Sequence, residues 1–318
     1  MTVDQFSLET RCLPFGEGAL TLAVRTLLAG EPVALPSETV YGLAADATNA
    51  RAVAAIYAAK GRPSFNPLIV HVVDRAMAEA VADFSLEARR LADAFWPGPL
   101  TLVLPRRADG PVCDLATAGL PTVALRMPDH SAMRAVIAAC GRPLAAPSAN
   151  RSGSISPTSA THVLASLGGR IPLIIDGGPT TEGIESTIVA LGTDGIRILR
   201  PGPITAEQLS ATGAAILSGG ADEAIEAPGQ LASHYCPDKP LRLEAKSAAD
   251  GEFLIGFGAM ASDYNLSEAG DLVEAAANLF AALHEADSSD ARSIAVAAVP
   301  NVGIGVAIND RLARAAMR

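Results

Sequence analysis

Between about residue 32 and residue 198, the sequence alternates short runs rich in β-branched residues with alanine-rich stretches of helical periodicity. Such runs are typical of buried strands, and the stretches between them are typical of amphipathic helices. A chain that alternates the two builds a sheet covered by helices, so the predicted class is α/β. We predict strands at Pro32–Leu35, Leu68–Val73, Leu100–Leu104, Thr122–Arg126, Pro143–Ala146, Leu173–Asp176, Ser186–Leu191 and Ile196–Arg200.

The helices between these strands have recognisable start signals. The last long one is expected to have Ser156 as its N-cap and Pro157 as its first residue. A shorter helix is expected to begin near Thr205, where Gln208 completes a capping box. The long helices are predicted at Asn49–Lys60, Leu86–Phe95, Ser131–Cys140 and Pro157–Leu167.

The alternation is interrupted by residues 218–240, which are rich in glycine, alanine and acidic residues and contain three prolines. This composition packs poorly and spans distance well, as linkers do. The pattern then resumes, with strands predicted at Glu252–Phe257 and Ser293–Val299 and helices at Asp271–Ala286 and Asn309–Met317. We therefore predict a first domain at residues 1–217, a linker or lid at 218–240, and a smaller α/β domain at 241–318.

The charge balance limits the partners of this chain. It has 24 Lys and Arg residues against 34 Asp and Glu, a net charge of −10, and 4% aromatic residues. Because no global positive field favours polyanions, we expect no direct DNA binding and no membrane association. The four widely spaced cysteines fit neither a zinc cluster nor a disulfide framework, and the acidic amino terminus does not resemble a signal peptide. We expect a cytoplasmic protein.

Two cations follow a predicted helix in the stretch Lys60-Gly61-Arg62-Pro63. Helix capping explains most of it, since lysine complements the helix dipole, glycine forms a left-handed cap and proline ends the helix. Arg62 is less well explained, because its guanidinium fork suits phosphate or carboxylate recognition. Capping and ligand binding both stay open for this stretch.

Small polar loops lie next to three predicted strands. They are Ser37-Glu38-Thr39, Ser148-Ala149-Asn150 and Glu185-Ser186-Thr187. Ligands in α/β sheets gather beyond the carboxyl ends of strands, where hydroxyl and amide groups offer nucleotide contacts. Hydroxyls beside carboxylates also stabilise turns, so a structural role is the alternative for each loop.

Taken together and in this order, the motifs resemble the YrdC family. The resemblance covers roughly residues 16–203 and rests on Lys60-x-Arg62, Ser148-x-Asn150, Leu35–Leu43, Trp96–Leu102, and Asp176-Gly-Gly178 before Glu185-Ser-Thr187. The tail resembles the longer, two-domain members through Ala227-Pro-Gly-Gln230, His234-Tyr-Cys-Pro237 and Gly305–Leu312. The resemblance implies a twisted mixed sheet with a concave ligand cavity, plus the second, smaller domain.

The resemblance also implies a cavity that holds ATP and threonine side by side, with Lys60 and Arg62 as catalytic residues. The expected threonine contacts are Thr39, His71, Arg126 and Ser186, with Arg126 facing the carboxylate. The expected ATP contacts are Lys60, Arg62, Asn66, Thr122, Ser148, Asn150, Ser156, Arg200 and Tyr235. From the residues alone, a charge at the end of an apolar strand needs a carboxylate partner, which fits Arg126, whereas His71 fits either a ligand contact or a core histidine. Ala146 stands where family members carry a hydroxyl, so only its backbone can contact ligand.

The implied activity is synthesis of L-threonylcarbamoyl-AMP from L-threonine, bicarbonate and ATP with release of pyrophosphate. The product would serve modification of the tRNA adenosine next to the anticodon, through downstream tRNA threonylcarbamoyl-transferase proteins. Mg²⁺ would be held mainly by the ATP phosphates, without a metal site on the protein. Two alternatives stay open: an RNA-binding or ribosome-maturation module, and a carbamoyl-phosphate-handling enzyme of the same fold. The low positive charge counts against the first, and the lack of zinc-finger cysteine clusters counts against the second.

The second domain contains an imitation of a dinucleotide-binding fingerprint, Gly256-Phe-Gly258, directly after a predicted strand. The following residues, Ser262–Asn265, do not predict a helix, so the helix terminus that would bind a pyrophosphate is missing. The sequence also contains no P-loop motif. We therefore predict an ATP site of another kind and leave the role of the second domain open.

Overall fold

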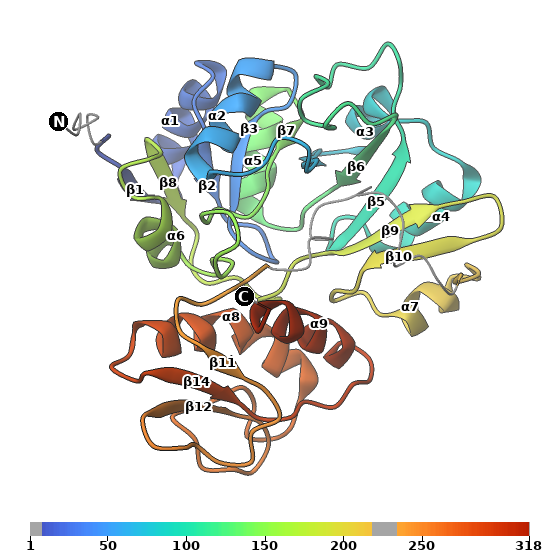
Figure 1. The fold of residues 1–318 in the computed structure, drawn as a ribbon. Helices are drawn as coiled ribbons and strands as arrows, with labels where there is room; N and C mark the ends of the chain where they lie inside the picture. Colours follow the sequence, from blue (N-terminus) through green and yellow to red (C-terminus); the bar gives the residue numbers. More distant parts are fainter. Residues whose placement is uncertain (1–7, 218–233, 318) are drawn as a thin grey trace.

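The computed structural model describes residues 8–217 and 234–317 and contains two separate sheets, each packed with its own helices (Figure 1). The larger sheet has ten strands. They are β1 (Arg11–Pro14), β2 (Val33–Leu35), β3 (Gly42–Asp46), β4 (Ile69–His71), β5 (Leu100–Pro105), β6 (Thr122–Arg126), β7 (Leu144–Ala145), β8 (Leu173–Asp176), β9 (Thr187–Leu191) and β10 (Ile196–Arg200). The helices of this part are α1 (Glu17–Leu28), α2 (Ala50–Lys60), α3 (Arg75–Val81), α4 (Leu86–Phe95), α5 (Ser131–Cys140), α6 (Ala160–Leu167) and α7 (Ala206–Ala211).

The ten strands run in the order β1-β8-β2-β3-β7-β4-β6-β5-β9-β10. Parallel pairs such as β4 with β6 alternate with antiparallel pairs such as β4 with β7, so the sheet is mixed. This confirms the predicted α/β class and the mixed character of the sheet. The strand order also brings segments far apart in the sequence, such as β3 and β7, next to each other at the centre.

One region of the large sheet is packed differently from the rest. Successive residues of a strand point to opposite faces of the sheet. Most of the buried strand residues pack with residues of the surrounding helices in a shared hydrophobic core. Toward the β10 edge of the sheet, however, five buried residues of the neighbouring strands β4, β6, β5 and β9 form a small cluster that includes no helical residue: Ile69, Val103, Ala124, Ile188 and Ala190. We call this cluster the apolar patch.

The second domain begins with a four-stranded, fully parallel sheet in the order β11-β14-β12-β13. Figure 1 shows α8 and α9 on the side of this sheet that faces the first domain. The strand after Gly256 is reached through a loop and not a helix, as predicted. The elements are β11 (Leu241–Arg242), β12 (Glu252–Gly256), β13 (Tyr264–Asn265), α8 (Leu272–Ser288), β14 (Ser293–Val296) and α9 (Gly305–Ala315).

Two predicted helix starts are wrong. The N-cap of α6 is Ser159, whose side chain accepts a hydrogen bond from the His162 amide, whereas Ser156 lies three residues earlier and binds elsewhere. Helix α9 begins at Gly305 rather than at Asn309. The capping box at Thr205 is confirmed. Residues 218–233 of the predicted linker lie outside the described residues, and the division into domains at 217 and 241 stays a prediction.

Candidate active site

A pocket opens where β4 and β6 end, next to the apolar patch. Their last residues, His71 and Arg126, are paired in register. Because alternate residues of a strand share a face, these two project from the same face as Ile69 and Ala124 of the apolar patch. His71, Arg126 and Ile69 line the pocket. The sheet thus places a charged and a polar side chain beside an apolar floor.

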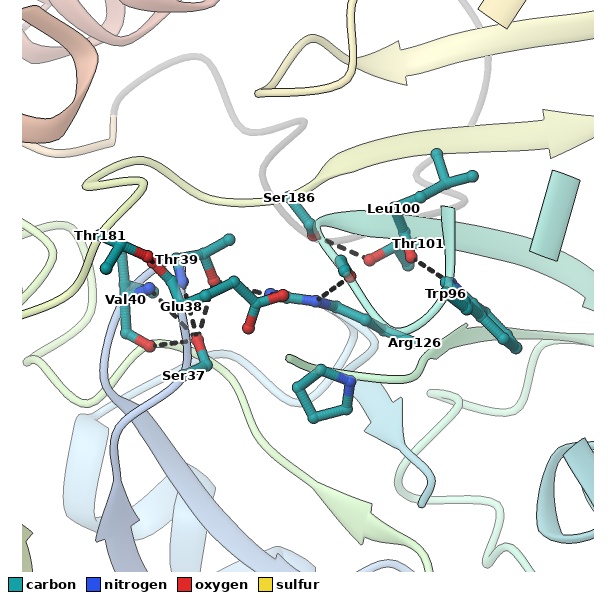
Figure 2. Close-up of polar contacts among 12 residues, drawn as sticks. Ser37, Glu38, Thr39, Val40, Trp96, Leu100, Thr101, Arg126, Thr181 and Ser186 are labelled. Atoms are coloured by element: carbon teal, nitrogen blue, oxygen red, sulfur yellow. Dashed lines mark hydrogen bonds and ion pairs between the residues drawn. The ribbon is translucent and has the colours of Figure 1, made fainter. Parts of the chain in front are cut away.

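All four residues predicted to contact threonine line this pocket: Thr39, His71, Arg126 and Ser186. The guanidinium of Arg126 donates hydrogen bonds to Thr39 Oγ1 at 2.8 Å and to the Gly98 carbonyl at 3.2 Å. Ser186 lies 2.8 Å from the hydroxyl of Thr101. Figure 2 shows the Arg126 side chain between the loop that carries Thr39 and the segment that carries Ser186. The structure therefore brings the four residues together around one guanidinium.

Sequence reasoning gave no role to Glu38, whose carboxylate lies against Arg126 (Figure 2). Glu38 Oε1 is 2.6 Å from Arg126 Nη2, and only 7% and 4% of the two side chains are exposed. Apart from this ion pair, neither carboxylate oxygen has a hydrogen-bond partner among the described residues. A buried arginine requires a counter-ion, and the acidic residue in the neighbouring Ser37–Thr39 motif was the available signal.

His71 is neutral in this environment. Burial, followed by the charge of Arg126, lowers the pKa of its imidazole to about 3. Its Nδ1 atom is buried and has no hydrogen-bond partner in the described part of the chain. His71 therefore offers the pocket an uncharged polar group.

Lys60 joins two of the motifs that the sequence singled out. It is the last residue of α2, and Gly61 follows in the left-handed conformation with a φ of 63°, so the capping interpretation is correct. The ammonium also crosses to the other motif, where it donates to the carbonyl oxygens of Ser148, at 2.6 Å, and Asn150. The Lys60 and Ser148 loops therefore meet at one site, and capping and site formation coexist.

The cations around the pocket are poorly neutralised. Lys60, Arg62 and Arg200 are buried, and within residues 8–217 and 234–317 none of them forms an ion pair with a carboxylate. Burial and the nearby Arg62 lower the pKa of Lys60, and burial lowers the pKa of Arg62 to about 10. Burial also lowers the pKa of Arg200. Buried positive charges without counter-ions favour a polyanionic ligand that can supply them.

The other residues predicted to contact ATP fall into two groups. Arg62, Ser148, Arg200 and Tyr235 line the pocket. Lys60, Asn66, Asn150 and Ser156 are buried behind its wall, and Thr122 lies at the opposite end of β6 from Arg126. The side-chain oxygens of Asn66 and Asn150 are buried without a hydrogen-bond partner among the described residues. Ser156 donates instead to the carboxylate of Glu185 at 2.5 Å.

Tyr235 reaches the pocket from the start of the second described segment. Its φ of 66° is unusual for a residue other than glycine. The ring packs against Phe280 of α8 and lies under the guanidinium of Arg311, while the buried hydroxyl has no hydrogen-bond partner among the described residues. His234 lines the pocket beside it. The second domain thus holds one wall of the pocket.

The described side chains around the pocket are not arranged as a metal site. Among the described residues, no three His, Cys, Asp or Glu side chains lie in a group that could hold a metal ion. The carboxylates next to the pocket, Glu38 and Glu185, are each paired with an arginine.

In the described part of the chain, no helix has the length and apolar character needed to cross a membrane.

Comparison with known proteins places this chain in one family. The Sua5/YciO/YrdC family model, described as "Telomere recombination", matches residues 25–202. The chain therefore belongs to the Sua5/YciO/YrdC family. A second model, described as "Threonylcarbamoyl-AMP synthase, C-terminal domain", matches residues 204–317. The expected family and its two-domain form are both confirmed.

Individual relatives agree with this assignment. The threonylcarbamoyl-AMP synthase of Bacillus subtilis is 42% identical over 92% of each chain. The crystal structure of Pyrococcus abyssi Sua5 in complex with L-threonine has a TM-score of 0.86 and 36% identity, and the match covers 97% of both chains. Escherichia coli YciO, 19% identical with a TM-score of 0.54, shares the fold over 62% of this chain.

Proposed function

We propose that this protein synthesises L-threonylcarbamoyl-AMP from L-threonine, bicarbonate and ATP with release of pyrophosphate. The observation that carries the proposal is the buried group of Lys60, Arg62 and Arg200. These three residues lack carboxylate partners among the described residues, and Arg62 and Arg200 line the same pocket as Arg126. A triphosphate supplies the missing negative charge, and an amino-acid carboxylate suits Arg126. The Bacillus subtilis relative carries this activity in its name, and the Pyrococcus abyssi relative was crystallised with L-threonine; both support the proposal.

In this proposal the Arg126 end of the pocket binds threonine. The Arg126 guanidinium takes the carboxylate, and Thr39, Ser186 and the neutral His71 offer polar contacts to the rest of the molecule. Arg62 and Ser148 line the other end of the pocket, with Lys60 directly behind them. This end binds the nucleotide, with Tyr235 against it and Asn66, Thr122, Asn150, Ser156 and Arg200 as the remaining predicted contacts.

The chemistry requires no protein nucleophile. The amine of threonine adds to bicarbonate with loss of water to give a carbamate, and a carbamate oxygen then attacks the α-phosphorus of ATP and expels pyrophosphate. Alignment of three small reactants can supply about 7–11 kcal/mol of the activation free energy. Lys60 and Arg62 contribute by placing fixed positive charge where negative charge develops on the phosphates.

Other parts of the proposal concern the surroundings of the reaction. Mg²⁺ would be held mainly by ATP and would offset negative charge on its phosphates, while Lys60 and Arg62 supply the positive charge that comes from the protein. The product is a mixed anhydride that water destroys, so downstream tRNA threonylcarbamoyl-transferase proteins consume it promptly. The place that combines ATP, bicarbonate and tRNA is the cytoplasm, and the four widely spaced cysteines fit that reducing compartment.

The test is pyrophosphate release in the presence of ATP, with threonine and bicarbonate each added or omitted. We expect release to require both, and we expect Lys60→Ala and Arg62→Ala to reduce it by about 100-fold or more, as loss of a group that stabilises developing charge does. Arg107→Ala is the matched control, because this arginine is exposed and paired with Asp109. Undiminished release in the Lys60 and Arg62 variants would contradict the mechanism.

The alternatives are tested in the same preparation. An RNA-binding module would show salt-dependent RNA affinity without ATP. An enzyme that handles carbamoyl phosphate would release phosphate from that compound and would not require threonine. We expect neither result, because the cations are buried around a pocket and do not lie along an exposed surface.

A further inference from the structure

Helix α9 of the second domain sends one arginine into the first domain. Arg311 is fully buried, with 0% of its side chain exposed. Its Nε donates to Glu185 Oε2 at 2.9 Å, and its Nη1 donates to the carbonyl of Pro201 at 2.8 Å. Asp310 of the same helix accepts a further hydrogen bond from Nη1. The proposed function gives Arg311 no role, although it lies in the Gly305–Leu312 motif.

Glu185 passes this contact on to the pocket wall. While Oε2 receives Arg311, Oε1 accepts the hydroxyl of Ser156 at 2.5 Å, so one carboxylate ties the two domains together. Burial raises the pKa of Glu185, but Arg311 and Arg200 more than offset it, and the net pKa lies below the usual value. Glu185 is therefore ionised and presents a strong acceptor to both partners.

The contacts of Arg311 touch the immediate neighbours of the proposed substrate residues. Glu185 precedes Ser186, and Pro201 follows Arg200, which itself donates to the carbonyl of Ser186 at 2.9 Å. The Arg311 guanidinium also lies 5.5 Å from the ring centre of Tyr235. One side chain of the second domain thus fixes three separate segments of the pocket wall.

We propose that Arg311 is a positioning residue of the active site, which acts through Glu185 to hold Ser156 and Arg200 in place for ATP. The inference rests on the proposed function and adds to it a task for the second domain: it completes the nucleotide end of the pocket.

Stabilisation of the contact between the two domains does not by itself account for this geometry. A buried ion pair stabilises a protein little or not at all relative to well-packed apolar residues of the same volume, because both charges lose their hydration. The neighbouring interface already has apolar contacts, since Phe280 of α8 packs against Tyr235. What a charged fork adds is direction, because it fixes one carboxylate and one carbonyl at set angles.

The experiment measures KM for ATP, KM for threonine and kcat in Arg311→Lys and Arg311→Gln, together with direct binding of a fluorescent ATP analogue. We expect both variants to raise KM for ATP and weaken the analogue by about 10- to 100-fold, the change that loss of a charge-assisted hydrogen bond corresponds to. Lysine, which keeps the charge but not the fork, should recover only part of the loss. Arg242→Gln, at a half-exposed arginine of the second domain that pairs with Glu252, is the control and should match the wild type.

A double-mutant cycle with Arg311→Met and Glu185→Gln keeps the idea testable if single variants fold poorly. The double variant removes both charges of the ion pair together, so neither is left buried without its partner, and it should fold. If Arg311 acts through Glu185, the two effects on KM for ATP are strongly non-additive, and the folded double variant still binds ATP weakly. Folded variants with wild-type ATP affinity, or fully additive effects, overturn the proposal. Failure of the proposed function would appear separately, as a wild-type protein that releases no pyrophosphate.

Discussion

The ion pair between Glu38 and Arg126 makes a sharp prediction about stability in the empty pocket. The substitution Glu38→Gln keeps the size of the side chain and removes its charge. Arg126 then remains buried, 3% exposed, hydrogen-bonded to the Thr39 hydroxyl and the Gly98 carbonyl but without its ion-pair partner. Since neither carboxylate oxygen has another partner among the described residues, no second contact of Glu38 offsets the loss.

The size of the effect follows from the burial of both groups. Removal of one partner of a buried ion pair costs about 3–5 kcal/mol, because the other charge stays desolvated. For a chain of this length that corresponds to a fall in Tm of roughly 4 to 8 °C. L-Threonine should raise the Tm of the variant more than that of the wild type, because its carboxylate replaces the missing negative charge on Arg126.

The assay is thermal unfolding of both proteins with and without threonine, followed by circular dichroism. Asp109→Asn is the control: its carboxylate is 75% exposed and paired with Arg107, so its loss should cost less than about 1 kcal/mol. A Glu38→Gln variant that melts within about 2 °C of the wild type would show that this pair is not the buried counter-ion contact inferred here.

Three further predictions concern stability. His71 has a folded pKa of about 3, so between pH 6.5 and 3 only the unfolded chain binds a proton there. The free energy of unfolding should therefore fall on acidification by up to about 1.4 kcal/mol per pH unit. In urea unfolding across pH 5–7, this free energy should depend less steeply on pH in His71→Asn than in the wild type. Thr205→Ala removes the capping box with Gln208 and should cost about 1 kcal/mol in urea unfolding without changing KM for ATP. Gly183→Ala places a Cβ 2.2 Å from the Ala277 carbonyl of α8 at a φ of 70°, and should lower stability by about 2–5 kcal/mol and expose the domain junction to limited proteolysis.

Much of the fold was predictable because local signals agree with it. Thr122–Arg126, Leu86–Phe95 and Ser131–Cys140 were predicted with the bounds that the structure has. Strand β3, Gly42–Asp46, was missed because it is buried on both faces and contains no β-branched residue, so neither alternation nor composition marks it. The wrong cap of α6 has a similar cause: two serines three residues apart both fit the N-cap, and the competing bond of Ser156 to Glu185 is long-range.

The candidate site divides in the same way. Lys60 and Ser148 could be predicted as neighbours only through the family resemblance, since their contact spans 88 residues. The pairing of Arg126 and Arg311 with particular carboxylates could not be predicted from the sequence. Glu38 lies next to Arg126 through β-sheet topology, and Glu185 meets Arg311 across the junction of the two domains. Neither pairing leaves a periodicity or a spacing in the sequence.

The short strand β4 sets the spacing between two parts of the pocket. At its first residue, the Ile69 carbonyl accepts the amide of Ala146, which anchors the loop to Ser148, and its last residue, His71, is paired with Arg126. Two residues of extended chain span roughly 7 Å, so covalent geometry sets the spacing between the anchor of the Ser148 loop and the strand position beside Arg126. Under the proposed function, this backbone spacing holds the nucleotide and threonine ends of the pocket at a set separation.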